Sequence, residues 1–119
     1  MKDWVPEIEK QSHADIVALQ EKKLQEVLAY VNEHSAFYKQ LFKEHNINVS
    51  AIKTLSDLTK LPTTCKDDLQ RDNDAFRCVP KSAIVDYAST SGTLGTPVTF
   101  GLTDNDLNRL AYNEAISLA

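Results

Sequence analysis

The chain has 119 residues, 42% of them hydrophobic and 25% charged, which fits one small globular unit and leaves no room for a large two-domain enzyme. The formal net charge of -4 at pH 7 comes without a dense cluster of lysine and arginine, which argues against nucleic acid as a partner. The sequence has neither an apolar stretch of about 20 residues that could span a membrane nor the apolar core of a signal peptide, so we expect a cytoplasmic protein with no membrane partner.

Helical patterns dominate the first part of the chain. Ser12-His13-Ala14-Asp15 is typical of a capping box that opens a helix. The apolar face of this helix would consist of Leu24, Val27, Leu28 and Val31. Ser35 is expected to cap a second, shorter helix, and Asn46 to end it. The core residues expected in this second helix are Phe37, Tyr38, Leu41 and Phe42.

Short helical turns are expected between Val49 and Phe76. Each would begin at a hydroxyl residue, one at Ser56 and another at Thr64, because such side chains cap the free N–H groups of a first helical turn. Leu61-Pro62 would separate the turns, since the residue before a proline avoids helical geometry.

Two strand-like segments, residues 83–88 and 98–102, follow on either side of a loop at residues 89–97. Thr103-Asp104-Asn105-Asp106 then forms another capping box. The helix that it opens has an apolar stripe made of Leu107, Leu110, Ala111, Ala115 and Leu118. We therefore expect an α+β fragment, mainly helical over residues 1–80, with a strand–loop–strand–helix unit over residues 81–119.

The loop Ser89-Thr90-Ser91-Gly92-Thr93-Leu94-Gly95-Thr96-Pro97 holds two of the three glycines of the chain and five hydroxyl side chains. Glycines let the backbone approach a phosphate group closely, and hydroxyl groups add hydrogen-bond donors around it. Ordinary hairpin loops have a similar composition, so the residue types alone leave both interpretations open.

The order Ser-Thr-Ser-Gly-Thr-x-Gly-x-Pro resembles the phosphate-binding motif of the acyl-adenylate-forming superfamily. Further blocks resemble the amino-terminal region of phenylacetate–CoA ligases, in the same order along the chain from about residue 6 to the last residue. These blocks are Pro6-Glu7-Ile8-Glu9, residues 34–38, residues 55–69 and Val79-Pro80.

This resemblance implies an acid–thiol (CoA) ligase that activates an aryl acid such as phenylacetate. The chain would be the start of the large α/β domain of such an enzyme, whose complete form uses ATP, Mg2+ and coenzyme A. A carboxylate attacks the α-phosphate of ATP to give an acyl-adenylate and pyrophosphate, and the thiolate of coenzyme A then displaces AMP. The residues that the resemblance assigns to the β- and γ-phosphates are Ser89, Thr90, Ser91, Gly92, Thr93, Gly95 and Thr96.

The motif departs from the superfamily pattern at two positions. Val98 stands where lysine commonly follows the proline, so one cation near the phosphates is absent, and Leu94 replaces a threonine. Lys66, just after a probable helix cap in a block shared with the resembling family, is our candidate for the replacement cation. The alternative is that Lys66 is an ordinary solvated surface lysine.

The last helix reaches Ala119 with its apolar stripe still in phase and without a stop signal, so we expect a truncated chain. In the resembling family the acid pocket, the magnesium-binding carboxylate and the domain with the catalytic lysine lie downstream. We therefore expect no catalytic residue in this chain, no tight cofactor binding and no ligase activity of its own. We also expect self-association, with a homodimer as one form of it. The alternatives are a non-catalytic helical interaction module with a structural loop, or an adenylate-forming enzyme for another acid.

Cysteine and histidine add little to these functions. Cys65 and Cys78 have no second cysteine pair or histidine cluster around them, so we expect two free thiols and no metal site. His13, His34 and His45 are scattered through helical sequence, where surface or capping roles are expected.

Overall fold

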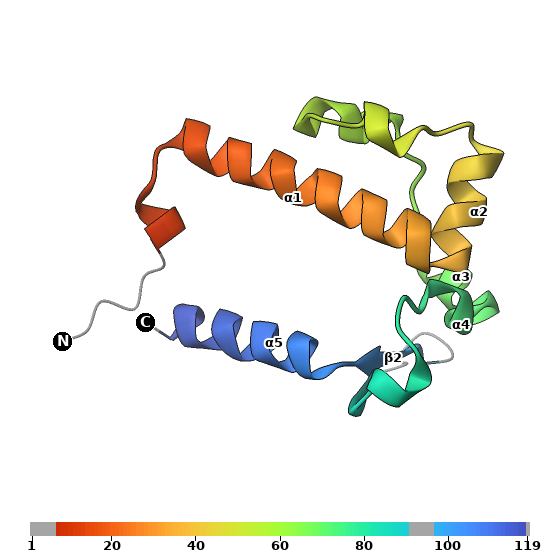
Figure 1. Ribbon diagram of the computed structural model, residues 1–119. Helices are drawn as coiled ribbons and strands as arrows, with labels where there is room; N and C mark the ends of the chain where they lie inside the picture. The colour runs from red at the N-terminus through yellow and green to blue at the C-terminus, as the bar shows by residue number, and fades with distance from the viewer. Residues whose placement is uncertain (1–6, 91–96, 119) are drawn as a thin grey trace.

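The computed structural model describes residues 7–90 and 97–118 (Figure 1). Its α-helices are α1 (His13–His34), α2 (Ala36–Glu44), α3 (Lys66–Arg71), α4 (Asn73–Phe76) and α5 (Asp104–Ser117). Its 3-10 helices are η1 (Glu7–Lys10), η2 (Val49–Ala51), η3 (Leu55–Lys60) and η4 (Lys81–Ala83). The strands β1 (Asp86–Ser89) and β2 (Thr99–Leu102) pair antiparallel. The expected order, helices followed by strand–loop–strand–helix, is confirmed.

The first two α-helices begin after the serines that the sequence indicated. Ser12 Oγ accepts a hydrogen bond from the Asp15 N–H, and Ser35 Oγ accepts one from the Tyr38 N–H, both with an N···O distance of 3.2 Å. α2 ends at Glu44, and Asn46 follows with a φ of 54°, the left-handed conformation common just after helices.

The start of η3 differs from the sequence-based expectation. Thr54 is the residue before its first turn, whereas Ser56 lies within it. The carboxylate of Asp57, three residues after Thr54, accepts hydrogen bonds from the N–H groups of Lys53 at 2.9 Å and Thr54 at 3.0 Å. Thr54 is therefore the N-cap residue of η3, because a capping box with Asp57 satisfies more of the free N–H groups than a lone hydroxyl does.

The start of α3 also lies one residue later than expected. Cys65, not Thr64, precedes the first helical residue. The Asp68 carboxylate accepts hydrogen bonds from the Cys65 N–H at 2.9 Å and from its thiol at 3.4 Å. Asp68 thus caps the observed start of the helix, although Thr64 has Asp67 at the same spacing.

The hydrophobic core lies between α1, α2 and the segment that follows them. Leu28, Phe42 and Ile52 are buried. The half-buried residues packed around them are Leu24, Val31, Tyr38, Ile47, Val49 and Leu61. Val27, which the helical spacing placed on the same face, is instead 51% exposed, because it points toward the other side of α1 and lines a cleft.

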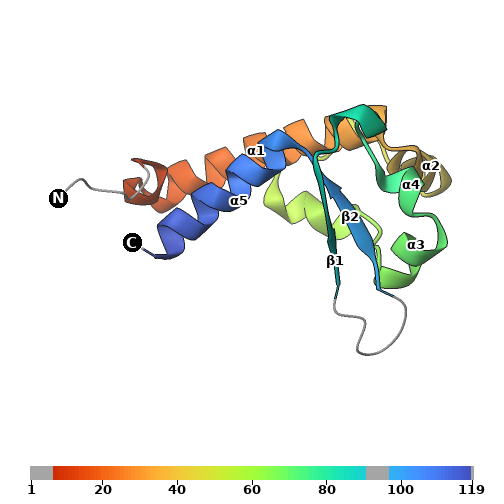
Figure 2. The same ribbon diagram turned by 90° about the horizontal axis from the view of Figure 1, so that it is seen from below.

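The hairpin pairs Asp86 with Leu102 and Ser89 with Thr99. The first strand is shorter than residues 83–88 suggested, because Lys81–Ala83 forms a 3-10 turn before it. Figure 2 shows the hairpin projecting from the helices. Residues 91–96, which follow Thr90, lie outside the part of the chain that the structure describes.

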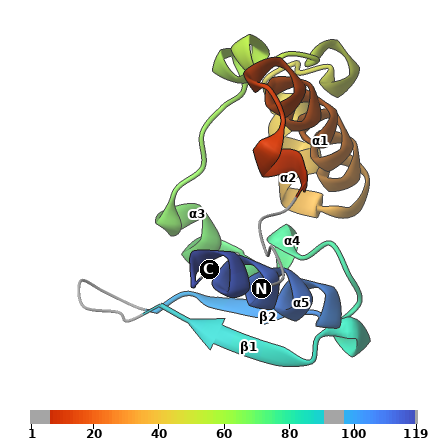
Figure 3. The same ribbon diagram turned by 90° about the vertical axis from the view of Figure 1, so that its left-hand side faces the viewer.

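In Figure 3, α1 and α2 lie in the upper part of the view and the hairpin and α5 in the lower part. The short helices α3 and α4 lie between them, and Phe76 of α4 stacks on Phe37 of α2. The capping box of α5 is confirmed, because Thr103 Oγ1 accepts from the Asp106 N–H at 3.2 Å. The apolar stripe of α5 is largely uncovered, with Leu110 51% and Leu118 85% exposed.

Candidate functional site

Four residues lie at the loop end of the hairpin, where the motif loop joins the two strands. We call Ser89, Thr90, Val98 and Thr99 the hairpin neck. The Thr90 N–H donates to the Val98 carbonyl at 2.9 Å, and the Val98 N–H donates to Thr90 Oγ1 at 2.9 Å. The hydroxyl oxygens of Ser89 and Thr99 lie 2.9 Å apart, so one donates to the other. Both ends of the loop are thus connected by side-chain and backbone hydrogen bonds.

Two contacts hold the hairpin against neighbouring elements. The Asn73 side-chain amide, on α4, donates to the Thr99 carbonyl at 2.8 Å. Near the other end of β2, a Cβ on Gly101 would lie 2.6 Å from Cδ1 of Ile84, so the absence of a side chain at Gly101 lets Ile84 pack onto the strand. The hairpin is therefore positioned from α4 and from the residue after η4.

The structure places only part of the predicted phosphate-contact set. Ser89 and Thr90 are exposed residues of the neck, and both hydroxyl groups have protein partners there. The other members, Ser91, Gly92, Thr93, Gly95 and Thr96, lie outside the described residues. Val98, at the position where the superfamily commonly has lysine, is only 3% exposed. A charged side chain in that environment would need a partner or a path to solvent.

Lys66 is the first residue of α3 and is exposed. Within residues 7–90 and 97–118 it forms no ion pair or hydrogen bond through its ammonium group. The Cys65 N–H, the Cys65 thiol and the Arg71 guanidinium hold the pKa of the neighbouring Asp68 carboxyl below its ordinary value. Lys66 is thus an exposed cation without an ion pair among the described residues, and the nearby Asp68 carboxylate is already bound to Cys65 and Arg71.

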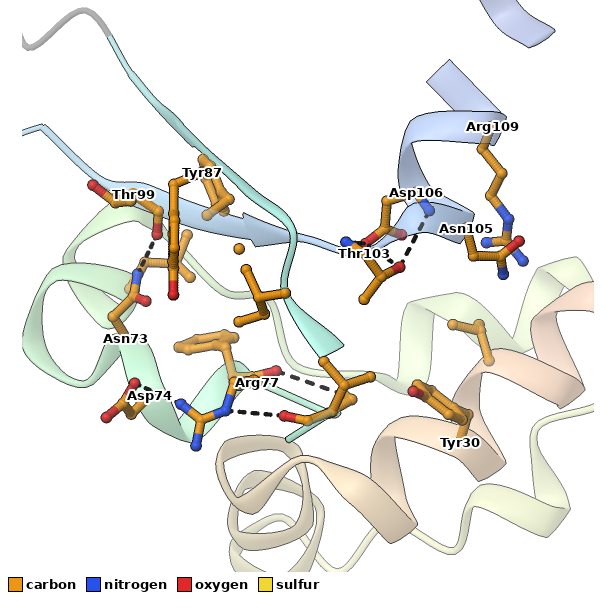
Figure 4. A pocket seen from close by; sticks show the side chains of 18 of the residues that line it. Tyr30, Asn73, Asp74, Arg77, Tyr87, Thr99, Thr103, Asn105, Asp106 and Arg109 are labelled. Atoms are coloured by element: carbon orange, nitrogen blue, oxygen red, sulfur yellow. Dashed lines mark hydrogen bonds and ion pairs between the residues drawn. The ribbon is translucent and has the colours of Figure 1, made fainter. Parts of the chain in front are cut away.

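A cleft of about 960 Å³ adjoins the neck and separates α1 from α5. Figure 4 shows Asn73 and Thr99 at one end of it and Tyr30 and Arg109 at the other. Its walls include apolar and aromatic side chains, among them Val27, Tyr30, Phe76, Tyr87 and Phe100. Such an uncovered mixture of apolar and polar side chains is typical of a surface that packs against another structure.

Some charged side chains of the cleft form ion pairs, and others do not. Asp74 accepts from the Arg77 guanidinium at 2.7 Å and lies 3.9 Å from the Lys81 ammonium. Lys23 pairs with Glu26 at 3.2 Å. Arg109, on α5, has no such ion pair within the described part of the chain.

Sequence reasoning did not identify Asn73, Thr99 or Arg109 as site residues. Asn73 contacts Thr99 across 26 positions of sequence, so no local pattern connects them. The pairing of Thr99 with Ser89 depends on the register of the hairpin, and the motif does not specify that register. For Arg109, the one available signal in the sequence is its position one helical turn after the capping box of α5.

The described residues contain no group of three or more histidine, cysteine, aspartate or glutamate side chains that could hold a metal ion. Cys65 is exposed and Cys78 half-buried, both as free thiols, and burial raises the pKa of Cys78. In the same part of the chain no helix is both long and apolar enough to cross a membrane.

Comparison with known proteins gives a consistent result. The chain is 38% identical over 118 residues to a phenylacetate-coenzyme A ligase of Thermus thermophilus, and 36% identical over 113 residues to the corresponding enzyme of Escherichia coli. These alignments cover 98% and 93% of this chain but 26% of each relative, so the chain spans about a quarter of their length. No protein-family model matches the chain.

A solved structure shares the fold. The chain superposes with a TM-score of 0.79 and 27% identity on a 2-hydroxyisobutyryl-CoA ligase in complex with 2-HIB-AMP and CoA. The superposition covers 95% of this chain and 28% of that protein. The α+β fragment is therefore a section of the fold of an adenylate-forming CoA ligase.

Proposed function

We propose that this chain, a relative of the phenylacetate-CoA ligases over nearly its whole length, forms the triphosphate-holding section of an ATP-dependent aryl acid–CoA ligase. The observation that carries the proposal is the hairpin neck. It holds together the two ends of a loop whose sequence has the hydroxyl and glycine content that a phosphate group requires.

The proposed reaction has two halves. The carboxylate of an aryl acid such as phenylacetate attacks the α-phosphate of ATP and pyrophosphate leaves, giving an acyl-adenylate. The thiolate of coenzyme A then attacks the acyl carbon, and AMP leaves as the thioester forms. In the first half, hydroxyl and amide groups of residues 91–96 would bind the β- and γ-phosphates and favour the departure of pyrophosphate.

The work of this section is positioning and charge stabilisation. No covalent step is assigned to a residue of the chain. Lys66 would supply a cation in place of the lysine that Val98 replaces. Mg2+ supplies charge neutralisation to reactions of ATP, but the described residues offer no ligand set for it. We therefore assign magnesium to none of them.

The organisation of the chain follows from this role. Residues 1–80 would form a mainly helical segment and residues 81–119 the beginning of the nucleotide-binding domain. The partners of the complete enzyme would be the acid, ATP and coenzyme A. Because cells hold ATP and coenzyme A in the cytoplasm, we propose that location.

The test compares the complete ligase that carries this sequence with the 119-residue polypeptide. We expect the complete ligase to catalyse ATP–pyrophosphate exchange that depends on an aryl acid, and to form the CoA thioester. The 119-residue polypeptide alone should do neither. Thioester formation by the polypeptide, or a complete ligase for which no carboxylic acid supports exchange, would contradict the proposal.

A pair of variants sharpens this test. Thr93→Val removes a loop hydroxyl, and the loss of one charge-assisted hydrogen bond should lower kcat/KM for ATP roughly 10- to 100-fold. Thr59→Val makes the same change at an exposed threonine of η3, whose hydroxyl donates only to the Ser56 carbonyl. This control should retain its ATP kinetics within about twofold.

A further inference from the structure

The backbone ladder of the hairpin ends in an unusual way at Thr90. In the register of the strands Thr90 faces Val98, and a regular pair at this position exchanges two backbone N–H···O=C hydrogen bonds. The Thr90 N–H makes its bond to the Val98 carbonyl at 2.9 Å. The Val98 N–H, however, donates to Thr90 Oγ1, also at 2.9 Å. The Thr90 hydroxyl thus occupies the place of its own carbonyl in the ladder.

The preceding pair is joined by its side chains. Ser89 and Thr99 face each other, and their hydroxyl oxygens lie 2.9 Å apart. In such a pair the side chains of antiparallel strands come close together on one face of the sheet. The carbonyl of Thr99 also accepts from the Asn73 amide at 2.8 Å, which connects the neck to α4.

These bonds involve the first two hydroxyl residues of the motif in contacts with the protein itself. A hydroxyl has one proton to donate. In the Ser89–Thr99 pair one of the two protons is used between the side chains, and the Thr90 oxygen is committed to Val98 as an acceptor. These bonds leave the Thr90 proton and one proton of the Ser89–Thr99 pair uncommitted among the described residues, but they fix the two hydroxyl oxygens of Ser89 and Thr90 at the point where the strands meet.

We propose that Ser89 and Thr90 are positioning residues, which close the hairpin neck together with Val98 and Thr99 and so preorganise the loop that meets the triphosphate. The closed neck follows from the hairpin geometry, whereas its effect on ATP binding rests on the proposed function. A neck that is closed before ATP arrives lowers the ordering cost of binding, because the two ends of the loop are already fixed. Its loss should therefore raise KM for ATP rather than change acid binding.

The geometric part is tested in the 119-residue chain without nucleotide. Amide hydrogen exchange at Val98, followed by NMR, should be roughly 2- to 12-fold faster in Thr90→Val, which loses the acceptor. Thr90→Ser retains the oxygen and should stay within about twofold of the parent chain. Thr59→Val controls for a threonine-to-valine change elsewhere. An unprotected Val98 amide in the parent, or equal exchange in Thr90→Val, would overturn the proposal.

The functional part is a double-mutant cycle on Ser89→Ala and Thr99→Val in the complete ligase. If the residues act together through the neck, each single variant should raise KM for ATP by a similar factor, about 2- to 12-fold. The KM for ATP of the double variant should be no higher than that of the more impaired single variant. The KM for the acid should stay constant in all three. A large effect of Ser89→Ala with no effect of Thr99→Val would make Ser89 a direct phosphate ligand and overturn the positioning role.

The two experiments also separate this inference from the function on which it rests. A complete ligase that uses no ATP would contradict the proposed function, whereas the exchange of Val98 would still decide whether the Thr90 hydroxyl closes the neck.

Discussion

Ser35 is a fully buried polar residue that serves three elements. It ends α1, caps α2 by accepting from the Tyr38 N–H, and donates its hydroxyl to the Ala75 carbonyl at 3.0 Å, which connects the helix junction to α4. Ser35 itself is fully buried, and both hydrogen bonds reach half-buried partners. Their loss should therefore cost more than that of an exposed helix cap.

We expect Ser35→Ala to lower the free energy of unfolding by about 1–3 kcal/mol, since it removes a cap and leaves the Ala75 carbonyl without its donor. Urea denaturation followed by circular dichroism measures this difference. Ser12→Ala is the matched control, because Ser12 caps α1 in an exposed position and should cost about 0.5–1 kcal/mol. An equal decrease in the free energy of unfolding of the two variants would contradict the larger contribution expected of the buried serine.

Lys66 tests whether an exposed lysine has a functional role. If it approaches the triphosphate, Lys66→Ala in the complete ligase should lower kcat/KM for ATP roughly 10- to 100-fold, because one charge-assisted phosphate contact is lost. The KM for the acid should change little. Lys39→Ala, at an exposed position of α2, controls for the loss of one positive charge. ATP kinetics equal to the parent in a folded Lys66→Ala protein would identify Lys66 as a surface residue.

At the scale of secondary-structure elements, the packing of the hairpin depends on Gly101. The three nearest atoms to a Cβ at this position all belong to Ile84, at 2.6, 3.1 and 3.2 Å. Cδ1 is the flexible end of that side chain, but Cγ2 is fixed close to the backbone. An added methyl group therefore forces Ile84 or the strand to move.

Gly101→Ala should lower the free energy of unfolding by about 1–3 kcal/mol, which is typical of overpacking. Ile84→Val removes the closest atom, Cδ1, so the double variant should recover part of the loss. Chemical denaturation of the two single variants and the double variant measures the coupling. Strict additivity would show that the two side chains do not compete for the same space.

The helices illustrate what local sequence predicts. The caps at Ser12, Ser35 and Thr103 were identified because each has its partner within three residues. Ser56 and Thr64 are wrong as helix starts. For η3 the spacing of Thr54 and Asp57 indicates the observed start, because Ser56 has no aspartate three residues later. For α3 the pairs Thr64–Asp67 and Cys65–Asp68 have the same spacing, so spacing alone does not choose between them.

Contacts between elements were beyond local reasoning. The bond from Asn73 to Thr99 depends on how α4 lies against the hairpin, and no short pattern encodes it. Helical spacing predicts an apolar stripe on α5, yet spacing does not say whether a stripe is covered. Exposed Leu110 shows that a periodic pattern predicts a potential contact surface and leaves the partner open.

At the scale of the whole molecule, much apolar surface is uncovered. Val27, Tyr30 and Tyr87 along the cleft are 51%, 44% and 61% exposed, and the stripe of α5 is similarly open. The chain spans about a quarter of its curated relatives, whose remaining parts offer a natural cover for this surface. An isolated polypeptide has only other copies of itself to provide that cover.

The 119-residue polypeptide should therefore self-associate reversibly at micromolar concentration, which sedimentation velocity at several concentrations would detect. Leu110→Lys places a charge on the exposed stripe and should shift the distribution toward monomer. Asn113→Lys adds the same charge at a polar, exposed position of α5 and should not. A monomer at every concentration tested would contradict this expectation.

The location of the core has a consequence for how the protein is made. The nine residues of the helical core cluster, from Leu24 to Leu61, lie within one continuous stretch that precedes the hairpin. Synthesis proceeds from the amino terminus at about 5–20 residues per second, and helical contacts close far faster than that. On the ribosome, the helical core can therefore assemble before the hairpin becomes available, and the candidate phosphate loop joins a scaffold that is already folded.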